Sequence, residues 1–464
     1  MYRTSFRAIL AFIFIFAAVS FASADEIDRI VMERLRERNI PGAAIAVIKN
    51  GKAVKMKGYG LASVEFDVPV STETVFEIGS VSKQMTAAAI MLLVEDGKVK
   101  LDAPISTYLP NTPDSWRDVT VRHLLTHTSG IKSYTSLTGF ELSRRVRIDG
   151  FIGQLAPHPL EFTPGDQTIY SNSGYNLLAY IIETQSGKPY MQFMRERIFT
   201  PLGMTKTGDR DPQFIIKNRA AGYEWNIDRL TGRDGSPTDL MGAGSIVSTI
   251  GDMVKWDAAL NGTSFLKPES RREWWTQFTL TNGKPSVYGF GWRISNIRGH
   301  KLIGHTGQTA GFGAANFRYV NDGVNVMVLT NLGEIGLGGQ LAARIAKAYI
   351  PGLSLKAITP RPEPVAGLGE KLLSVLRARN AGSLDKAPLA PQLIRSLFTD
   401  RAKAAYKRIA ALGDPSNAAF VEIDETGNRI AYRYRVAAGK RLFLWRVSVD
   451  DEGRIAEMSL EEEE

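Results

Sequence analysis

The position of the strand-forming segments most constrains the fold, because they lie at both ends of a long region and enclose helical patterns. Near its start, the apolar run 43–48 is followed by Asn50-Gly51, a strong hairpin signal, and by a second predicted strand. Near its other end, further strands are predicted at 302–303, 314–319 and 324–329. We therefore expect an α/β arrangement whose sheet is assembled from distant parts of the chain.

Helical patterns fill the interior of this region. A charged helix is predicted over 27–40, an amphipathic helix from about 80 to 95 before Asp96-Gly97, and shorter helices at 121–126 and 176–185. The spacing and punctuation of these elements predict one large domain over residues 25–350.

A second, smaller domain is predicted after residues 351–366, a linker with four prolines and no periodicity. Residues 367–464 carry helical patterns at 368–379, 389–397 and 402–412, followed by strands at 429–436 and 441–449. The first of these strands is expected to place Ile430, Tyr432, Tyr434 and Val436 on one face. This order predicts a small α+β domain.

Residues 1–24 have the three parts of a secretory signal peptide. A basic start is followed by a short apolar stretch over 8–19 and by Ala22-Ser23-Ala24, an A-x-A cleavage site. The alternative, a membrane anchor, needs a longer apolar stretch. We expect cleavage after Ala24, with no stable membrane anchor afterwards, and a periplasmic or secreted protein. The leader does not distinguish these two locations.

The amino-acid composition excludes several classes of chemistry and makes a nucleic-acid partner unexpected. The absence of cysteine excludes disulfides, thiolate metal sites, cysteine nucleophiles and a lipoprotein anchor. The formal net charge of +9 comes from scattered lysines and arginines, whereas a nucleic-acid footprint gathers them on one element. We therefore expect no nucleic-acid partner, and we expect any nucleophile to be an oxygen or a nitrogen.

Ser80 and Lys83 begin the predicted helix, three residues apart and hence on one face. Unpaired amide N–H groups in the first turn of a helix would stabilise a developing alkoxide on Ser80 and disfavour the ammonium form of Lys83. Burial would lower the pKa of Lys83 further. By itself, Ser-x-x-Lys is a weak signal, because a helix-capping serine followed by a solvated lysine gives the same pattern.

Two further segments make the pattern specific. Tyr170-Ser171-Asn172 precedes a helical segment, and His305-Thr306-Gly307 begins a strand-like one. With these motifs in this order, and with LLTHTSG (124–130) and AGSIVSTIGDMVKW (243–256), the chain resembles the penicillin-binding protein and class C β-lactamase superfamily of serine hydrolases. The resemblance covers roughly residues 25–350 and implies a β-lactamase/transpeptidase-like fold, with a mainly antiparallel sheet flanked by helices and a helical subdomain.

The resemblance also implies roles for the motif residues. Ser80 would be the nucleophile that forms an acyl-enzyme, and Lys83 and Tyr170 would share general-base and proton-shuttle work, with the choice between them open. Either base needs a lowered pKa, which adjacent cations can produce for a phenol. Asn172 would orient Lys83 and bind a substrate carbonyl, and the backbone N–H groups of Ser80 and Gln308 would form the oxyanion hole. His305, Thr306 and Gly307 would line the substrate site, where Gly307 allows a close backbone approach.

His305 departs from the lysine that many β-lactamases and transpeptidases carry before Thr-Gly. A histidine is mostly neutral at pH 7 and is a poorer fixed partner for a carboxylate. This form resembles the esterases, D-aminopeptidases and other peptidases of the superfamily. We therefore expect uncharged esters or amides to be preferred.

Other motifs give no competing chemistry. His123 and His127 have the i, i+4 spacing of a zinc helix, but Leu124 stands where the usual glutamate would be, so we interpret both as structural. No serine is central in G-x-S-x-G, which gives an α/β-hydrolase elbow no candidate. Phe312 and Tyr134 are expected to pack in the core, as is Phe140. We expect neither a metal nor an organic cofactor.

The sequence thus predicts an exported serine hydrolase that forms an acyl-enzyme on Ser80 and acts on a small-molecule or peptide-like ester or amide. Two alternatives stay open. One is a non-catalytic or slowly deacylating penicillin-binding sensor, and the other is a true β-lactamase.

Overall fold

The computed structural model describes residues 24–139, 147–211, 214–233, 241–262, 264–381, 383, 386–391, 393–394, 410–411, 413–424 and 430–463. All but the last residue of the predicted signal peptide, and Phe140, therefore lie outside the described residues. In the described part of the chain, no helix combines the length and apolarity that crossing a membrane requires.

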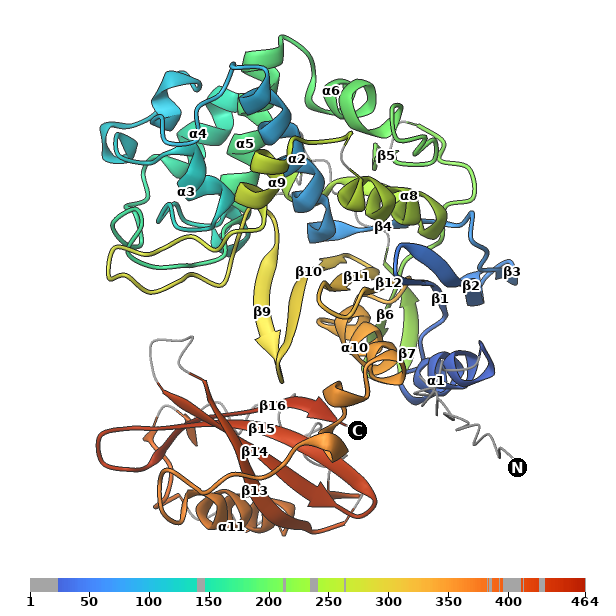
Figure 1. Ribbon diagram of the computed structural model, residues 1–464, viewed down its shortest axis with the longest axis vertical. Helices are drawn as coiled ribbons and strands as arrows, with labels where there is room; N and C mark the ends of the chain where they lie inside the picture. Colours follow the sequence, from blue (N-terminus) through green and yellow to red (C-terminus); the bar gives the residue numbers. More distant parts are fainter. Residues whose placement is uncertain are drawn as a thin grey trace, which may run out of the picture.

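A seven-stranded sheet in the order β3-β2-β1-β12-β11-β10-β9 forms the centre of the larger unit (Figure 1). β1 pairs antiparallel with β12 from Ala43↔Thr330 to Lys49↔Val324, which joins distant segments as predicted. Every pairing in the sheet is antiparallel. The strands are β1 Gly42–Lys49, β2 Lys52–Ser63, β3 Val68–Pro69, β9 Arg293–Ile297, β10 His300–Thr309, β11 Phe312–Tyr319 and β12 Val324–Thr330.

Helices cover both faces of the sheet, which explains why β1 is apolar at successive positions rather than at alternate ones. Ile45 and Val47 pack on one face with α1 (Ala24–Glu37) and α10 (Leu337–Tyr349). Ala44, Ala46 and Ile48 point to the other face and join the core of the helical region.

The helical region lies between β2 and β9 in the sequence and packs over that second face (Figure 1). Its described α-helices are α2 Ser82–Glu95, α3 Val121–Leu125, α4 Ile148–Leu155, α5 Asn172–Ser186, α6 Tyr190–Met194, α7 Met241–Gly244, α8 Ile250–Asn261 and α9 Pro268–Trp274. Short strands form two further sheets, β4 (Val75–Glu77), β8 (Ile246–Thr249) and β5 (Gly208–Asp209) in one, and β6 (Tyr223–Asn226) with β7 (Arg229–Gly232) in the other.

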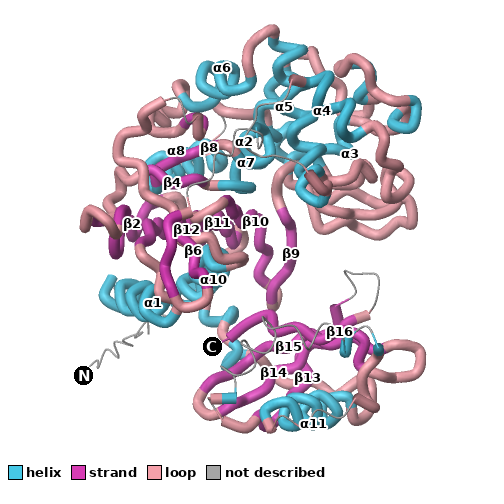
Figure 2. The backbone as a smooth tube through the Cα atoms, turned by 180° about the vertical axis from the view of Figure 1, so that it is seen from behind, coloured by secondary structure: helices cyan, strands magenta, loops and turns pink. Residues whose placement is uncertain are grey.

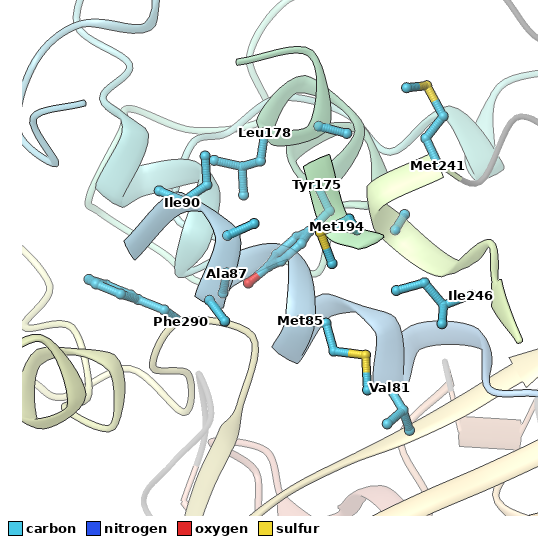
Figure 3. Packing of buried hydrophobic residues seen from close by; sticks show 14 of the residues in the cluster. Val81, Met85, Ala87, Ile90, Tyr175, Leu178, Met194, Met241, Ile246 and Phe290 are labelled. Atoms are coloured by element: carbon cyan, nitrogen blue, oxygen red, sulfur yellow. The ribbon is translucent and has the colours of Figure 1, made fainter. Parts of the chain in front are cut away.

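α2 differs from the amphipathic helix that the sequence predicts. Every residue from Ser82 to Leu93 is buried, so the helix has no solvated face until its last turn. Figure 3 shows Met85, Ala87 and Ile90 of α2 surrounded by side chains from other helices, including Tyr175 and Leu178 of α5. The polar residues of α2 find partners inside the protein, which is why their spacing looked like a solvated face.

The C-terminal unit is α+β, as predicted. Figure 2 shows α11 (Leu368–Asn380) beside a four-stranded sheet. The strands form an antiparallel meander, β13 Pro415–Asp424, β14 Ala431–Ala438, β15 Arg441–Val449 and β16 Ile455–Glu463. Tyr434 and Val436, which were predicted to share one face, are both buried, whereas Ile430 precedes β14 and is 51% exposed. Most of the segments 389–397 and 402–412 lies outside the described residues.

The predicted linker is packed against the C-terminal sheet rather than free. It contains two short 3₁₀ turns, Pro351–Leu353 and Leu355–Ala357. Leu355 is buried with Val421 and Leu444, and the Arg435 guanidinium donates to the carbonyl of Leu355 at 3.0 Å. An ion pair between Arg441 and Glu37 at 3.0 Å also connects the C-terminal unit to α1.

Candidate active site

Ser80 lies in a 3₁₀ turn, Gly79–Val81, that leads directly into α2. The turn is fixed from both sides, because the N–H of Ile78 donates to the carbonyl of Ile246 at 3.0 Å and Val81 is buried in the core. Ser80 itself is partly exposed. The predicted helix start is therefore shifted by two residues, but Ser80 and Lys83 still face each other across one turn.

Lys83 is fully buried, and three oxygen atoms surround its amine. Nζ lies 3.0 Å from Ser80 Oγ, 2.8 Å from Asn172 Oδ1 and 2.7 Å from the carbonyl oxygen of Ala243. Burial holds the pKa of Lys83 well below its ordinary value. Burial thus shifts the equilibrium toward the neutral amine.

The number of hydrogens on a neutral amine fixes the direction of the contact with Ser80. The carbonyl oxygens of Asn172 and Ala243 only accept hydrogen bonds, so they take both N–H groups of Lys83. The lone pair on Nζ then faces Ser80 Oγ. In this state the Ser80 hydroxyl donates to Lys83, which is the arrangement that a general base requires.

Tyr170 and Asn172 reach the same point from the start of α5. The Ser171 side chain caps this helix by accepting from the N–H of Gly174 at 3.4 Å, so the helix begins at Asn172, earlier than predicted. The Tyr170 hydroxyl donates to Ser80 Oγ at 2.8 Å. Burial raises the pKa of Tyr170 well above its ordinary value, opposite to the lowered pKa that a phenolate base needs.

One edge of β10 borders the 3₁₀ turn that carries Ser80. β9 pairs with β10 only as far as Gly304, so the stretch from His305 to Thr309 leaves this edge without a strand. A Cβ added to Gly307 would lie 1.9 Å from the carbonyl oxygen of Ile78 and 3.2 Å from the backbone nitrogen of Ser80. The approach of strand and turn thus requires glycine at this position, as predicted.

Gly79, in the 3₁₀ turn, likewise lies very close to the backbone of β10. It has a φ of +49°, and a Cβ there would lie 2.6 Å from the backbone nitrogen of Gln308. The backbone nitrogen of Gln308 therefore lies close to the turn that carries Ser80.

His305 is buried on the face of β10 that looks toward Tyr170. Its Nδ1–H donates to the carbonyl of Thr306 at 2.6 Å, which leaves Nε2 as an acceptor without a hydrogen-bond partner among the described residues. Burial and the nearby Lys83 lower the pKa of His305 to about 3. The neutral imidazole expected from the sequence is thus the favoured form.

The side chains of Thr306 and Gln308 lie on the opposite face of β10. Thr306 pairs with Ala315, which belongs to the core beside α10, and its methyl group would lie 2.9 Å from a Cβ on Gly339 of that helix. The structure therefore brings the side chains of Ser80, Lys83, Tyr170, Asn172 and His305 together, with the backbone of 306–308. It does not bring the Thr306 or Gln308 side chain to Ser80.

Sequence reasoning missed two rings and a carbonyl that surround these residues. The His127 ring lies 4.4 Å from that of Tyr170, and the Tyr288 ring lies 4.7 Å from that of His127 and 6.0 Å from that of His305, centroid to centroid. The third group is the Ala243 carbonyl on Lys83. The amino-acid sequence does not show which backbone carbonyl will contact Lys83. By contrast, the position of His127 just before Thr128-Ser129-Gly130 could have drawn attention to this histidine.

His127 looked like the partner of His123 on one helix, but α3 ends at Leu125 and the two rings diverge. His123 packs edge-on against Phe278. Within the described ranges, no group of three or more histidine, aspartate or glutamate side chains is placed to hold a metal ion. Phe312 and Tyr134 are fully buried in the core, as predicted.

We predict that Gly307→Ala destabilises the protein, because both atoms nearest the new methyl group belong to the backbone and cannot turn away. Overpacking of this kind costs about 1–3 kcal/mol of unfolding free energy. Urea unfolding measures the loss. Gly232→Ala is the control, since its Cβ would meet nothing within 4 Å, and an equal effect of the two substitutions would contradict the close approach.

We predict that Lys83 makes the free energy of unfolding rise as the pH approaches about 10. Its folded-state pKa lies well below its unfolded value, so between these two pKa values the unfolded chain binds a proton that the folded chain does not. Stability therefore increases with pH, by up to about 1.4 kcal/mol per unit. Urea unfolding of the wild type and of Lys83→Met at several pH values should show that the unfolding free energy of the wild type rises with pH relative to that of the variant. The same pH dependence in both proteins would contradict a lowered pKa of Lys83.

Comparison with known proteins identifies the family of this chain. Residues 27–349 match the family model described as Beta-lactamase. Penicillin-binding protein 4* of Bacillus subtilis (strain 168) is 29% identical over 322 residues, which cover 66% of this chain and 71% of that protein. A D-aminopeptidase of Gluconobacter oxydans (strain 621H) is 24% identical over 378 residues, covering 78% of this chain and 70% of that protein.

Solved structures show the same fold. The D-amino acid amidase of Ochrobactrum anthropi SV3, complexed with L-phenylalanine amide, superposes with a TM-score of 0.61 at 27% identity. The alignment covers 71% of this chain and 100% of that chain. The family match spans well over half of the sequence, so the chain belongs to the Beta-lactamase family, within the superfamily of serine hydrolases that includes penicillin-binding proteins.

Proposed function

We propose that the protein is an exported serine hydrolase that forms an acyl-enzyme on Ser80 and hydrolyses uncharged esters or amides, small or peptide-like. One observation carries this proposal. Ser80 Oγ lies 3.0 Å from the buried Lys83 amine and 2.8 Å from the Tyr170 hydroxyl, although Tyr170 is 90 residues away from Ser80 in the sequence. A serine held by a base and by a second proton donor is the usual arrangement for nucleophilic catalysis.

Lys83 is the base in this proposal. As Ser80 Oγ attacks the substrate carbonyl carbon, its proton passes to the lone pair of Nζ, and a C–O bond forms while the carbonyl oxygen becomes negative. The resulting ammonium lies 4.8 Å from the centre of the Tyr170 ring and 5.5 Å from that of Tyr175, so both ring faces stabilise it.

Tyr170 then carries the proton to the leaving group. Its raised pKa keeps the hydroxyl protonated, so it donates its proton to the departing oxygen or nitrogen and regains one from the Lys83 ammonium. The acyl-enzyme remains, and water attacks it by the same steps in reverse order. The backbone N–H groups of Ser80 and Gln308 would hold the oxyanion, where one such donor contributes about 10²–10³ in rate.

The remaining residues would bind the substrate. Asn172 is fixed by Lys83 through Oδ1 and is partly exposed, so its amide can meet a substrate carbonyl. His305 borders the site as a nearly buried neutral ring, which gives a substrate carboxylate no positive charge to pair with. Thr306 and Gly307 would contribute through the backbone of the β10 edge.

We predict that wild-type protein turns over p-nitrophenyl esters or D-amino-acid amides, and that Ser80→Ala abolishes this turnover. The covalent site follows from a fluorophosphonate label located by mass spectrometry on Ser80. A stoichiometric burst without turnover would support the slowly deacylating sensor instead. Rapid hydrolysis of nitrocefin, in preference to esters and amides, would support a true β-lactamase.

We predict that the wild type prefers a neutral substrate to a matched carboxylate. p-Nitrophenyl methyl succinate and p-nitrophenyl hydrogen succinate differ only in whether the far carboxyl group is a methyl ester or a free carboxylate, and kcat/KM at pH 7, corrected for spontaneous hydrolysis, should be higher for the neutral ester. The reason is that neutral His305 offers a carboxylate no permanent positive charge. A strong preference for the carboxylate would overturn the proposed substrate class.

A further inference from the structure

His127 lies in the left-handed region of backbone conformation, with a φ of +59°. α3 ends at Leu125, and the chain turns sharply there, so the His127 side chain leaves the axis of the helix. A histidine in this conformation is uncommon and requires surrounding contacts to hold it. The residue is almost fully buried, with 1% of its surface exposed.

The contacts of His127 are to the two residues that flank Tyr170. The N–H of Ile169 donates to the His127 carbonyl at 3.0 Å, and the N–H of Ser171 donates to His127 Nδ1 at 3.2 Å. Between these two hydrogen bonds, the imidazole ring lies against the Tyr170 ring, with centroids 4.4 Å apart and planes at 38°. His127 thus holds the backbone on both sides of Tyr170 and one face of its ring.

Other rings fix the imidazole in turn. Tyr175 lies 5.1 Å from it, and Tyr288 packs edge-on at 4.7 Å. Because Nδ1 accepts the N–H of Ser171, the neutral ring carries its proton on Nε2, which has no hydrogen-bond partner among the described residues. A second proton on Nδ1 would point at the Ser171 N–H, so the contact itself requires the neutral ring. Burial also lowers the pKa of His127 well below its ordinary value.

We propose that His127 is a positioning residue for Tyr170, which holds the phenol so that its hydroxyl meets Ser80 Oγ. This inference rests on the proposed function and adds a residue that touches neither the substrate nor Ser80. The left-handed backbone conformation of His127 directs its imidazole toward residues 169–171. The hydrogen bond from the Ser171 N–H to Nδ1 then fixes the position of that segment, and with it the position of Tyr170. Displacement of a reacting group by about 1 Å can lower a rate by about 100-fold, so loss of this hold should be visible in kcat.

Two substitutions separate positioning from packing. In His127→Asn, the amide oxygen takes the place of Nδ1, and asparagine tolerates a positive φ well. In His127→Gln, the side chain is longer and its amide reaches toward the place of Nε2, so the acceptor for Ser171 is lost. We expect kcat for a p-nitrophenyl ester to change by less than about 5-fold in His127→Asn and to fall by about 100-fold in His127→Gln, with similar KM values.

His123→Asn is the matched control. His123 also accepts a backbone N–H at Nδ1, from Thr120 at 3.2 Å, but this contact belongs to the cap of α3 and does not involve Tyr170. We expect kcat of this variant to stay near that of the wild type. Loss of kcat in His123→Asn equal to that in His127→Gln would show that general disturbance of the α3 region explains the effect.

A double-mutant cycle with Tyr170→Phe gives the sharper test. If His127 acts through the Tyr170 hydroxyl, then His127→Gln should lower kcat little further once that hydroxyl is absent. Additive losses would overturn the proposal, and so would equal kcat values for His127→Asn and His127→Gln.

The rate of fluorophosphonate labelling at Ser80 supplies a second readout for all variants. It should follow the same order, with His127→Gln slow and His127→Asn close to the wild type. A wild type that neither labels nor turns over any substrate would refute the proposed hydrolase, whereas a reactive wild type with unaffected His127 variants would refute only the positioning role.

Discussion

The burial of one amine determines the chemistry of this site. Lys83 lies inside a helix that is enclosed on every side, and its amine meets three oxygen atoms from three different segments. Two of these oxygens can only accept, so the neutral amine has a single lone pair left for Ser80. If this lysine were exposed, it would be charged at neutral pH and would donate to Ser80 instead of accepting its proton.

This arrangement depends on the rest of the fold. Residues 82–93 of α2 are buried because the central sheet covers one side of the helix and other helices cover the remainder. The sheet also places β10 against the 3₁₀ turn that precedes α2. The backbones approach so closely at Gly307 and Gly79 that neither position has room for a side chain. Sheet and helices therefore meet at Ser80, and the backbone of β10 lies directly against the turn that carries it.

Sequence reasoning predicted contacts between residues that are close together in the sequence. Ser80 and Lys83 are one helical turn apart, so their contact follows from helix geometry. Sequence reasoning placed His305 and Thr306 together in the substrate site, whereas the pairing of Thr306 with Ala315, which packs in the core beside α10, puts the Thr306 side chain on the opposite face of β10. α2 looked amphipathic because buried polar partners such as Asn316, which donates to Gln84 at 3.0 Å, come from far along the chain. His127 was paired with His123 because the end of α3 at Leu125 has no strong signal.

One of the three oxygens around Lys83 belongs to the main chain. The carbonyl of Ala243 accepts from the amine whatever side chain residue 243 carries, provided that α7 keeps its path. Evolution can therefore exchange the amino acid at this position without removing the acceptor. Comparing only amino-acid identities among relatives would then overlook a group that holds the amine in place, and the shape of the short helix is what selection has to preserve.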